Sequence, residues 1–283
     1  MRGAALAATI SSAFVLLFLF SSHGARSPRR AARADDSCAP CAISPPRRAE
    51  IILWDTEQTA WEGSNARGWS GVVPGTRRRE YREVIQLSAL RVLWDPATSS
   101  LRAADQLRTF VRPTLNPTLS AYVQRLTNIS QAQVDAGLPF HAAVRAFLRF
   151  ASRGGAPGAG GACVPLLSWG NDWAVVARQL QLLNESLPPE HAALPGCAHD
   201  VRTVLQAAGL NLSGYHSGTI HRAIDLPTRG HIHDSAWDAR SLYITLKEVL
   251  KRPAANLCLL RAVCPHSRGS YLRCAEQCEH REA

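Results

Sequence analysis

The pattern of apolar and polar residues predicts three β-strands early in the chain. Residues 50–54, EIILW, form a short apolar run that is typical of a buried strand. Residues 83–94, EVIQLSALRVLW, alternate well and predict a second strand. The third, RTFVRP at 108–113, ends at Pro113 because proline cannot donate to a strand ladder. The short connections between these strands favour antiparallel neighbours.

Helical patterns dominate after the third strand. The predicted helices cover residues 116–127, 130–137, 140–153, 172–184, 199–209, 219–226 and 234–251. One more apolar strand, CVPLLSWG at 163–170, interrupts them, and residues 61–80 carry the Gly, Ser, Asn and Arg of a loop. This order predicts an α/β fold with a mixed central sheet flanked by helices.

The N-terminus has the pattern of a signal peptide, residues 1–25. Arg2 precedes an apolar run at 10–20, and small residues follow it. The predicted location is secreted or lumenal, with no stable membrane association after cleavage. Two alternatives remain open: an uncleaved anchor, although the run is short for a full span, and a plastid leader, since ARSPRRAARA is Arg-rich and lacks acids. Residues 26–48 are predicted to be a linker or pro-segment.

Other sequence features agree with the secretory route. Three N-x-S triplets begin at Asn128, Asn184 and Asn211. The number of cysteines is even, so an oxidising compartment would pair them as disulfides. They are Cys38, Cys41, Cys163, Cys197, Cys258, Cys264, Cys274 and Cys278. Four lie in a Cys-rich tail, 253–283, where a Zn²⁺ site is the less favoured alternative because a C-x-x-C pair is lacking.

The net charge of +10 agrees with a polyanionic partner, although a merely soluble basic protein is an equally good reading of charge alone. Arg77 to Arg79 suit a phosphate backbone or a solvated charge run. Trp61 and Trp69 suit either stacking on bases or packing inside the protein.

Two acids follow the first predicted strand directly. Asp55 and Glu57 are two residues apart, so a continuing strand would place them on one face. Like charges at the end of a buried strand repel each other and resist desolvation. A hard divalent cation with oxygen ligands removes both costs. The alternative is that both acids face water in a loop.

Three further residues extend this set. Asp172 follows a predicted strand at the start of a helix, where the helix dipole alone also accommodates an acid. His233 precedes Asp238 by five residues, which places the histidine before the last long helix and the aspartate one turn inside it. The alternative is a surface histidine beside an unrelated acid.

The ordered pattern resembles the DEDDh group of 3′-to-5′ exonucleases, which have the ribonuclease H-like fold. The matching motifs are DTE at 55–57, Asp172 in SWGNDW, and HDSAWD at 233–238. FVRPTLNPTLSAYVQRLTNISQAQVDAGLPF at 110–140 resembles the segment between the first two motifs. The resemblance covers about residues 49–252 and is best to the Eri-1-like exoribonuclease branch. One departure is Gln58, where the family usually has threonine.

The resemblance implies a mechanism and a substrate class. Asp55, Glu57, Asp172 and Asp238 would hold two divalent cations, Mg²⁺ or Mn²⁺, and His233 would act as general base. The substrate would be single-stranded or 3′-overhang RNA, with DNA as the alternative, and the product a nucleoside 5′-monophosphate. The sequence does not indicate which protein partners, if any, the chain has.

Two other function classes remain open on the sequence. One is a catalytically inactive nucleic-acid-binding member of the same fold. The other is a secreted, disulfide-stapled interaction protein with incidental acids. The second predicts that the four carboxylates lie more than about 10 Å apart, too far to share a two-metal site.

Overall fold

The computed structural model describes residues 49–63, 70–72, 79–152, 164–192 and 194–263. The strands are β1 (Ala49–Gln58), β2 (Ser70–Val72), β3 (Arg79–Tyr81), β4 (Val84–Asp95), β5 (Ser100–Arg112), β6 (Leu138–Pro139), β7 (Leu166–Ser168) and β8 (Ala198–Asp200). The α-helices are α1 (Ala121–Thr127), α2 (Gln131–Asp135), α3 (Phe140–Ser152), α4 (Asp172–Leu182), α5 (Arg202–Ala207), α6 (Ser235–Val249) and α7 (Pro253–Val263). Short 3₁₀ helices are η2 (Pro189–His191), η3 (Leu194–Cys197) and η4 (Ile220–Ile224).

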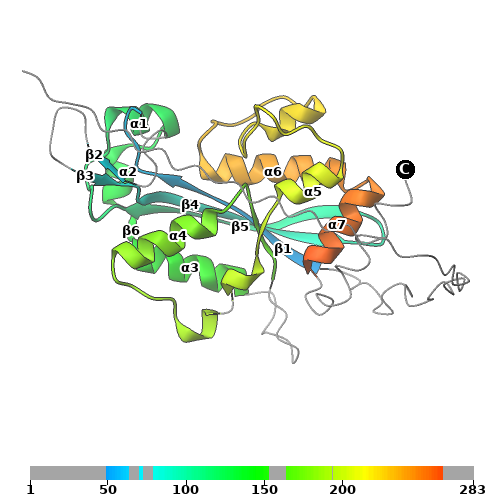
Figure 1. Cartoon of the computed structure of the whole chain (residues 1–283), viewed down its shortest axis with the longest axis horizontal. Coiled ribbons are helices and arrows are strands. Elements are labelled where there is room, and N and C mark those ends of the chain that lie inside the picture. The colour runs from blue at the N-terminus through cyan, green and yellow to red at the C-terminus, as the bar shows by residue number, and fades with distance from the viewer. Residues whose placement is uncertain (1–48, 64–69, 73–78, 153–163, 193, 264–283) are drawn as a thin grey trace, which may run out of the picture. The chain divides into compact units, whose positions relative to one another are not determined.

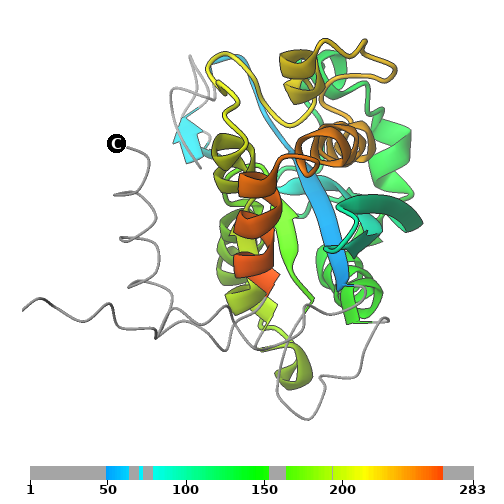
Figure 2. The same cartoon turned by 90° about the vertical axis from the view of Figure 1, so that its right-hand side faces the viewer.

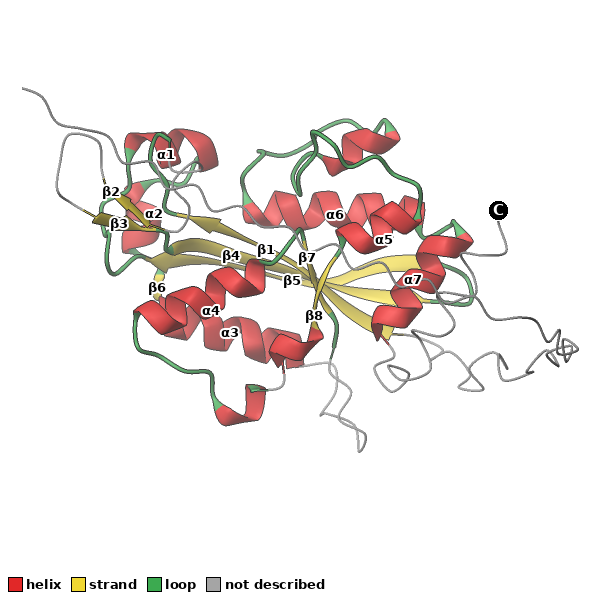
Figure 3. Cartoon of the chain, viewed as in Figure 1, coloured by secondary structure: helices red, strands yellow, loops and turns green. Residues whose placement is uncertain are grey.

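The main sheet is mixed, as the sequence predicts, and its order is β6-β5-β4-β1-β7-β8 (Figure 3). β1 pairs with β4 and β4 with β5 in antiparallel fashion, which confirms the prediction for the first three strands. β7 and β8 then add in parallel on the other side of β1. β1 is therefore an interior strand, paired on both sides.

Helices cover both faces of this sheet, and the alternation of β1 side chains shows how (Figure 1). Ile51 and Leu53 pack into a core with α5, α6 and α7. Ile52 and Trp54 point the other way, into a core with α3 and α4. Figure 2, turned by a quarter turn, shows β1 between the two helical layers. Both faces of β1 are thus apolar up to Trp54, which explains the unbroken run IILW.

The structure differs from the sequence prediction at several element boundaries. β5 begins at Ser100 rather than near 108, because its first half is mostly solvent-exposed and polar and gives little apolar signal. The helix predicted from residue 116 begins at Ala121, where the Ser120 side chain accepts a hydrogen bond from Val123 N. The pattern at 219–226 forms only the short helix η4. Two short strands, β2 and β3, lie within the predicted 61–80 loop.

Several sequence predictions concern residues outside the described ranges. These are the signal peptide, the linker, Trp69, Arg77, Arg78 and most of the cysteines. Of the segment predicted as a Cys-rich tail, residues 253–263 form α7, whose Ala255 and Leu259 are buried in the core. Within the part of the chain that the structure describes, no helix has both the length and the apolar composition needed to cross a bilayer.

A buried carboxylate, Glu83, fixes the turn after β5. Its side chain is fully buried and accepts hydrogen bonds from three successive backbone N–H groups: Thr114 at 2.7 Å, Leu115 at 2.9 Å and Asn116 at 2.6 Å. A carboxylate that accepts several N–H bonds stabilises donors that would otherwise be buried without partners.

Replacing Glu83 with alanine should lower the free energy of unfolding by about 3 kcal/mol or more, because buried N–H donors lose their acceptor. Urea unfolding followed by circular dichroism measures this change. Glu190, which is exposed on η2, provides the matched control, and Glu190→Ala should change stability by less than about 0.5 kcal/mol. Equal effects of the two substitutions would contradict the proposed role of the Glu83 carboxylate in holding the turn after β5.

Candidate active site

The two acids of the DTE motif lie near the C-terminal end of strand β1, where β1 is still paired with β4, and not in a loop. β1 continues to Gln58, with Asp55 opposite Ser88 and Glu57 opposite Gln86 of β4. Their exposed fractions are only 6% and 8%, which excludes the alternative that both face water. Asp55 and Glu57 share the strand parity of Leu53, so they belong to the α6 face of the sheet. A register irregularity follows Glu57 directly.

The opposite face of β1 provides a contact to the second motif. Thr56, between the two acids, donates a 2.8 Å hydrogen bond from Oγ1 to Asp172 Oδ1. Asp172 is the first residue of α4, as predicted, and Asn171 caps that helix by accepting from Ala174 N. The preceding turn is held by Asp200, which accepts a 3.0 Å hydrogen bond from Gly170 N. The hydrogen bond from Thr56 to Asp172 therefore connects strand β1 with the start of helix α4, next to Asp55 and Glu57.

The third motif reaches the same place from α6. Asp234 caps this helix by accepting from Ala236 N, and Asp238 lies in its first turn, as the spacing predicts. Ser235, at the start of the helix, bonds to Gln86 and to Ser88 of β4 at 2.8–2.9 Å. These buried bonds fix the helix end over the β1–β4 pair.

Three of the four carboxylates form one buried cluster, and the charge of the fourth, Asp172, acts on Asp55 and Glu57. Oxygens of Asp55, Glu57 and Asp238 all lie within 4.8 Å of one another. Burial, and then the charges of neighbouring acids, hold the pKa of Asp55 and that of Glu57 well above their ordinary values. Burial also raises the pKa of Asp172 to about 7 and that of Asp238 to about 7, against the hydrogen bonds that each receives. Without a counterion, this arrangement costs free energy.

The donor set of this cluster fits divalent cations. Asp172 Oδ2 and Asp238 Oδ1 are buried and accept no hydrogen bond from the described residues. Ser217 donates to the other oxygen of Asp238 at 2.9 Å, and a Cβ at Gly218 would collide with this carboxylate. Oxygen-only ligands with unpaired, inward-facing atoms suit Mg²⁺ or Mn²⁺. A cation there would replace the hydrogen bonds that these two oxygens lack.

His233 lies beside the cluster with an unusual backbone. Its φ is +68°, in the left-handed region that non-glycine residues seldom adopt. Its ring stacks on His216, with 5.0 Å between ring centroids and 10° between planes. Ring nitrogens of both histidines lie within 4.8 Å of a carboxylate oxygen of Asp238. Burial first, and then the positive neighbours His216 and His231, lower the pKa of His233, which favours a neutral ring at neutral pH.

The sequence singled out five residues, and the structure brings all five to one end of β1. Sequence reasoning missed the residues that hold them: Thr56, His216 and Ser217, together with the Gln86–Ser235 contact. The polar residue within DTE was the one available signal. Of the other sequence candidates, Trp61 is 6% exposed, which agrees with packing inside the protein.

Gln58 and Asp234 have distinct surroundings. Gln58 lies partly buried beside Glu57, and its Oε1 has no hydrogen-bond partner among the described residues. Asp234 forms a 2.9 Å ion pair with Arg108 of β5, so the residue after His233 is tied to the sheet. Both residues flank the acids without belonging to the cluster.

Comparison with known proteins supports the fold assignment. No sequence-family model and no curated protein sequence matches the chain. Among solved structures, a 3′-exonuclease described in 3′-end recognition of a histone mRNA stem-loop is similar, with 20% identity over 73% of this chain and 83% of that one and a TM-score of 0.56. The nuclease domain of 3′hExo, a DEDDh family member bound to rAMP, has 20% identity over 75% and 96% of the two chains and a TM-score of 0.55.

A more distant example is cell-death related nuclease 4, which has 20% identity over 75% of this chain and 66% of that one, with a TM-score of 0.53. At these identities the likeness concerns the fold. The mixed sheet and the helices on both of its faces are those expected from the sequence. The resemblance is therefore confirmed at the level of the fold, and this chain has the ribonuclease H-like fold of the DEDDh exonucleases.

Proposed function

We propose that this chain is a metal-dependent 3′-to-5′ exonuclease that hydrolyses nucleic acid, with RNA favoured, to nucleoside 5′-monophosphates. The observation that supports this best is the buried cluster of Asp55, Glu57 and Asp238, with Asp172 one hydrogen bond from β1 and His233 beside it. Carboxylates held within 4.8 Å of one another count against an interaction protein with incidental acids. The activity assay below distinguishes this function from that of a catalytically inactive nucleic-acid-binding protein with the same fold.

The proposed roles follow from the donor atoms. Two divalent cations, when bound, would stabilise charge on the attacking and leaving oxygens of an in-line phosphoryl displacement. Asp55, Glu57, Asp172 and Asp238 would hold them. A neutral His233 ring nitrogen would accept a proton from the attacking water, whose oxygen bonds to phosphorus while the bond from phosphorus to the 3′ oxygen breaks. The leaving 3′ oxygen takes a proton from solvent and becomes the new 3′ hydroxyl, and His233 later returns its proton to solvent.

RNA is favoured because one similar exonuclease recognises the 3′ end of a histone mRNA stem-loop and another is bound to rAMP. DNA remains the competing substrate, since exonuclease I, described in a complex with single-stranded DNA, is also similar, with 14% identity and a TM-score of 0.50. The identity of the sugar is therefore best decided by direct comparison.

The test uses matched RNA and DNA oligonucleotides labelled at the 5′ end. In Mg²⁺, 3′-to-5′ removal should give a ladder of shortened labelled products, RNA should be cleaved faster, and a 3′-phosphorylated substrate should resist. EDTA should stop the reaction. Binding of the oligonucleotide without any product in Mg²⁺ or Mn²⁺ would support the inactive alternative instead.

His233→Ala should lower kcat by roughly 10²- to 10⁴-fold, the usual contribution of a positioned general base. His231, two residues away and exposed, bonds through Nε2 to Leu126 O at 3.1 Å and provides the matched control. His231→Ala should retain most activity. A similar loss in both variants would point to disturbance of the loop rather than to loss of a base.

We also propose that residues 1–25 direct the chain into the secretory lumen and are then cleaved. The three N-x-S triplets and the even number of cysteines support this proposal. Cys197 is buried, whereas most of the other cysteines lie outside the described residues. The mass of the secreted chain after alkylation, with and without reductant, tests both cleavage and disulfides.

A further inference from the structure

The three N-x-S triplets share one arrangement in the folded domain. In each triplet the asparagine and the serine are exposed, while the middle residue is turned at least partly inward. The triplets are Asn128-Ile129-Ser130, Asn184-Glu185-Ser186 and Asn211-Leu212-Ser213. Ile129 belongs to a core cluster and Leu212 packs against another. A sugar on any of these asparagines would leave the packing intact.

Local structure explains two of these triplets without any sugar. Asn128 ends α1 in the left-handed conformation, and Ser130 caps α2 by accepting from Gln133 N. The Asn211 side chain accepts a 2.9 Å hydrogen bond from Ser213 N, which closes its turn. Both patterns therefore have a conformational reason.

The triplet at Asn184 is different. A φ of +54° after α4 accounts for an asparagine there, because asparagine tolerates this region. It does not account for Ser186. Neither Asn184 nor Ser186 forms a side-chain hydrogen bond with the described parts of the chain, and both are exposed. The local structure therefore gives no reason for a serine at position 186.

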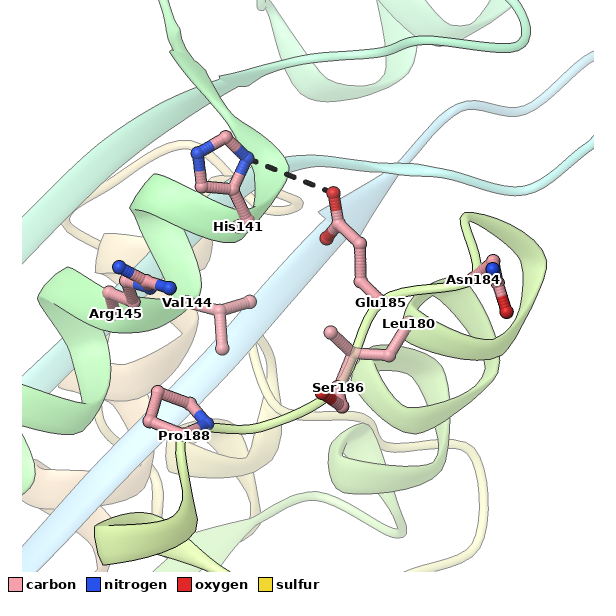
Figure 4. A pocket seen from close by; sticks show the side chains of 8 residues that line it. All are labelled: His141, Val144, Arg145, Leu180, Asn184, Glu185, Ser186 and Pro188. Atoms are coloured by element: carbon pink, nitrogen blue, oxygen red, sulfur yellow. Dashed lines mark ion pairs between the residues drawn. The ribbon is translucent and has the colours of Figure 1, made fainter.

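A hollow of about 310 Å³ lies beside Asn184, between α3 and the chain that leaves α4 (Figure 4). Val144, Leu180 and Pro188 give it apolar lining. His141 and Glu185 add polar groups, with 3.7 Å between Nδ1 and Oε1, and Figure 4 shows them turned toward each other. A pyranose ring has an apolar face and a hydroxyl edge, so this lining matches a sugar.

We propose that Asn184 carries an N-linked glycan whose first N-acetylglucosamine lies in this hollow. The donor would be a lipid-linked oligosaccharide pyrophosphate of the secretory lumen. The Asn184 amide nitrogen gains a bond to the anomeric carbon, the bond from that carbon to the pyrophosphate oxygen breaks, and the amide proton leaves with the lipid pyrophosphate. The proposal rests on the secretory route and is independent of the nuclease chemistry.

Occupancy is tested on the full chain expressed in a eukaryotic secretory cell. Peptide mass spectrometry should find the glycan on Asn184, and treatment with a glycan-releasing amidase should convert that residue to aspartate. Asn184→Gln and Ser186→Ala should each remove this glycan, whereas Ser186→Thr should keep it. Secreted chain with unmodified Asn184, or chain that never enters the lumen, would overturn the proposal.

Seating in the hollow is tested by stability. Ser186→Ala, which removes the glycan and keeps Asn184 at its positive φ, should lower Tm by about 2–4 °C relative to the glycosylated chain, because the hollow loses its sugar. Trimming the glycan to its first sugar should leave Tm unchanged. Ser213→Ala is the matched control: it removes the Asn211 triplet, which lies outside the residues that line this hollow, keeps the hydrogen bond from residue 213 N to Asn211, and should change Tm less. Equal shifts for the two variants would exclude the seated sugar.

Discussion

Replacing Asp55 with asparagine is expected to abolish nuclease activity and, at the same time, to raise the Tm of the metal-free protein. The activity should fall by at least about 1000-fold, because a central charged ligand is lost. The stability should rise because Asp55 is buried among like charges that hold its pKa well above the ordinary range. Asparagine has nearly the same shape as aspartate and carries no charge.

The direction of the stability change follows from the raised pKa of Asp55. One pH unit in a pKa corresponds to about 1.4 kcal/mol, and about 1 kcal/mol changes Tm by roughly 2–4 °C in a domain of this size. Thermal unfolding in EDTA at pH 8, above the pKa of about 7 of Asp172 and Asp238, measures the change. Asp225→Asn, an exposed acid, is the control and should change neither quantity by much. A lower Tm for Asp55→Asn would contradict the inference that repulsion among these carboxylates destabilises the metal-free protein.

The sequence was informative wherever a pattern had one physical reading. The apolar run IILW required burial on both faces, and β1 is indeed an interior strand between two helical layers. The spacing from His233 to Asp238 placed the aspartate one turn inside α6, and the structure agrees. Asp172 likewise begins α4.

The sequence was uninformative where tertiary contacts decide. The first half of β5 is polar and exposed, so only its pairing with β4 reveals a strand. His216 contacts His233 across a stretch of chain that has no periodic spacing, and Thr56 reaches Asp172 over 116 positions. Such contacts depend on how α4 and α6 approach β1, which no local pattern encodes. Glu83 begins a predicted strand, and nothing in the local sequence indicates that its carboxylate is fully buried.

The second prediction concerns metal-free protein and pH. Asp172 and Asp238 have pKa values of about 7 in the folded chain, well above the ordinary value of 3.8. The folded state therefore binds more protons than the unfolded state between about pH 4 and pH 7, and its stability should fall as pH rises through this window. Asp200 acts in the opposite sense, since its pKa is lowered, but its contribution is complete near pH 5.

Mg²⁺ should reverse this loss, and by more at high pH. The cation competes with protons for the same oxygens, so its stabilising effect requires ionised carboxylates. We expect 10 mM Mg²⁺, roughly a saturating concentration, to raise Tm at pH 8 and to have little effect at pH 5. NaCl at equal ionic strength controls for screening of the repulsion. A general salt effect would appear with either salt, so an equal response of Tm to Mg²⁺ and to NaCl would mean that the four carboxylates are not a cation site. A Tm that rises from pH 5 to pH 8 in EDTA would lead to the same conclusion.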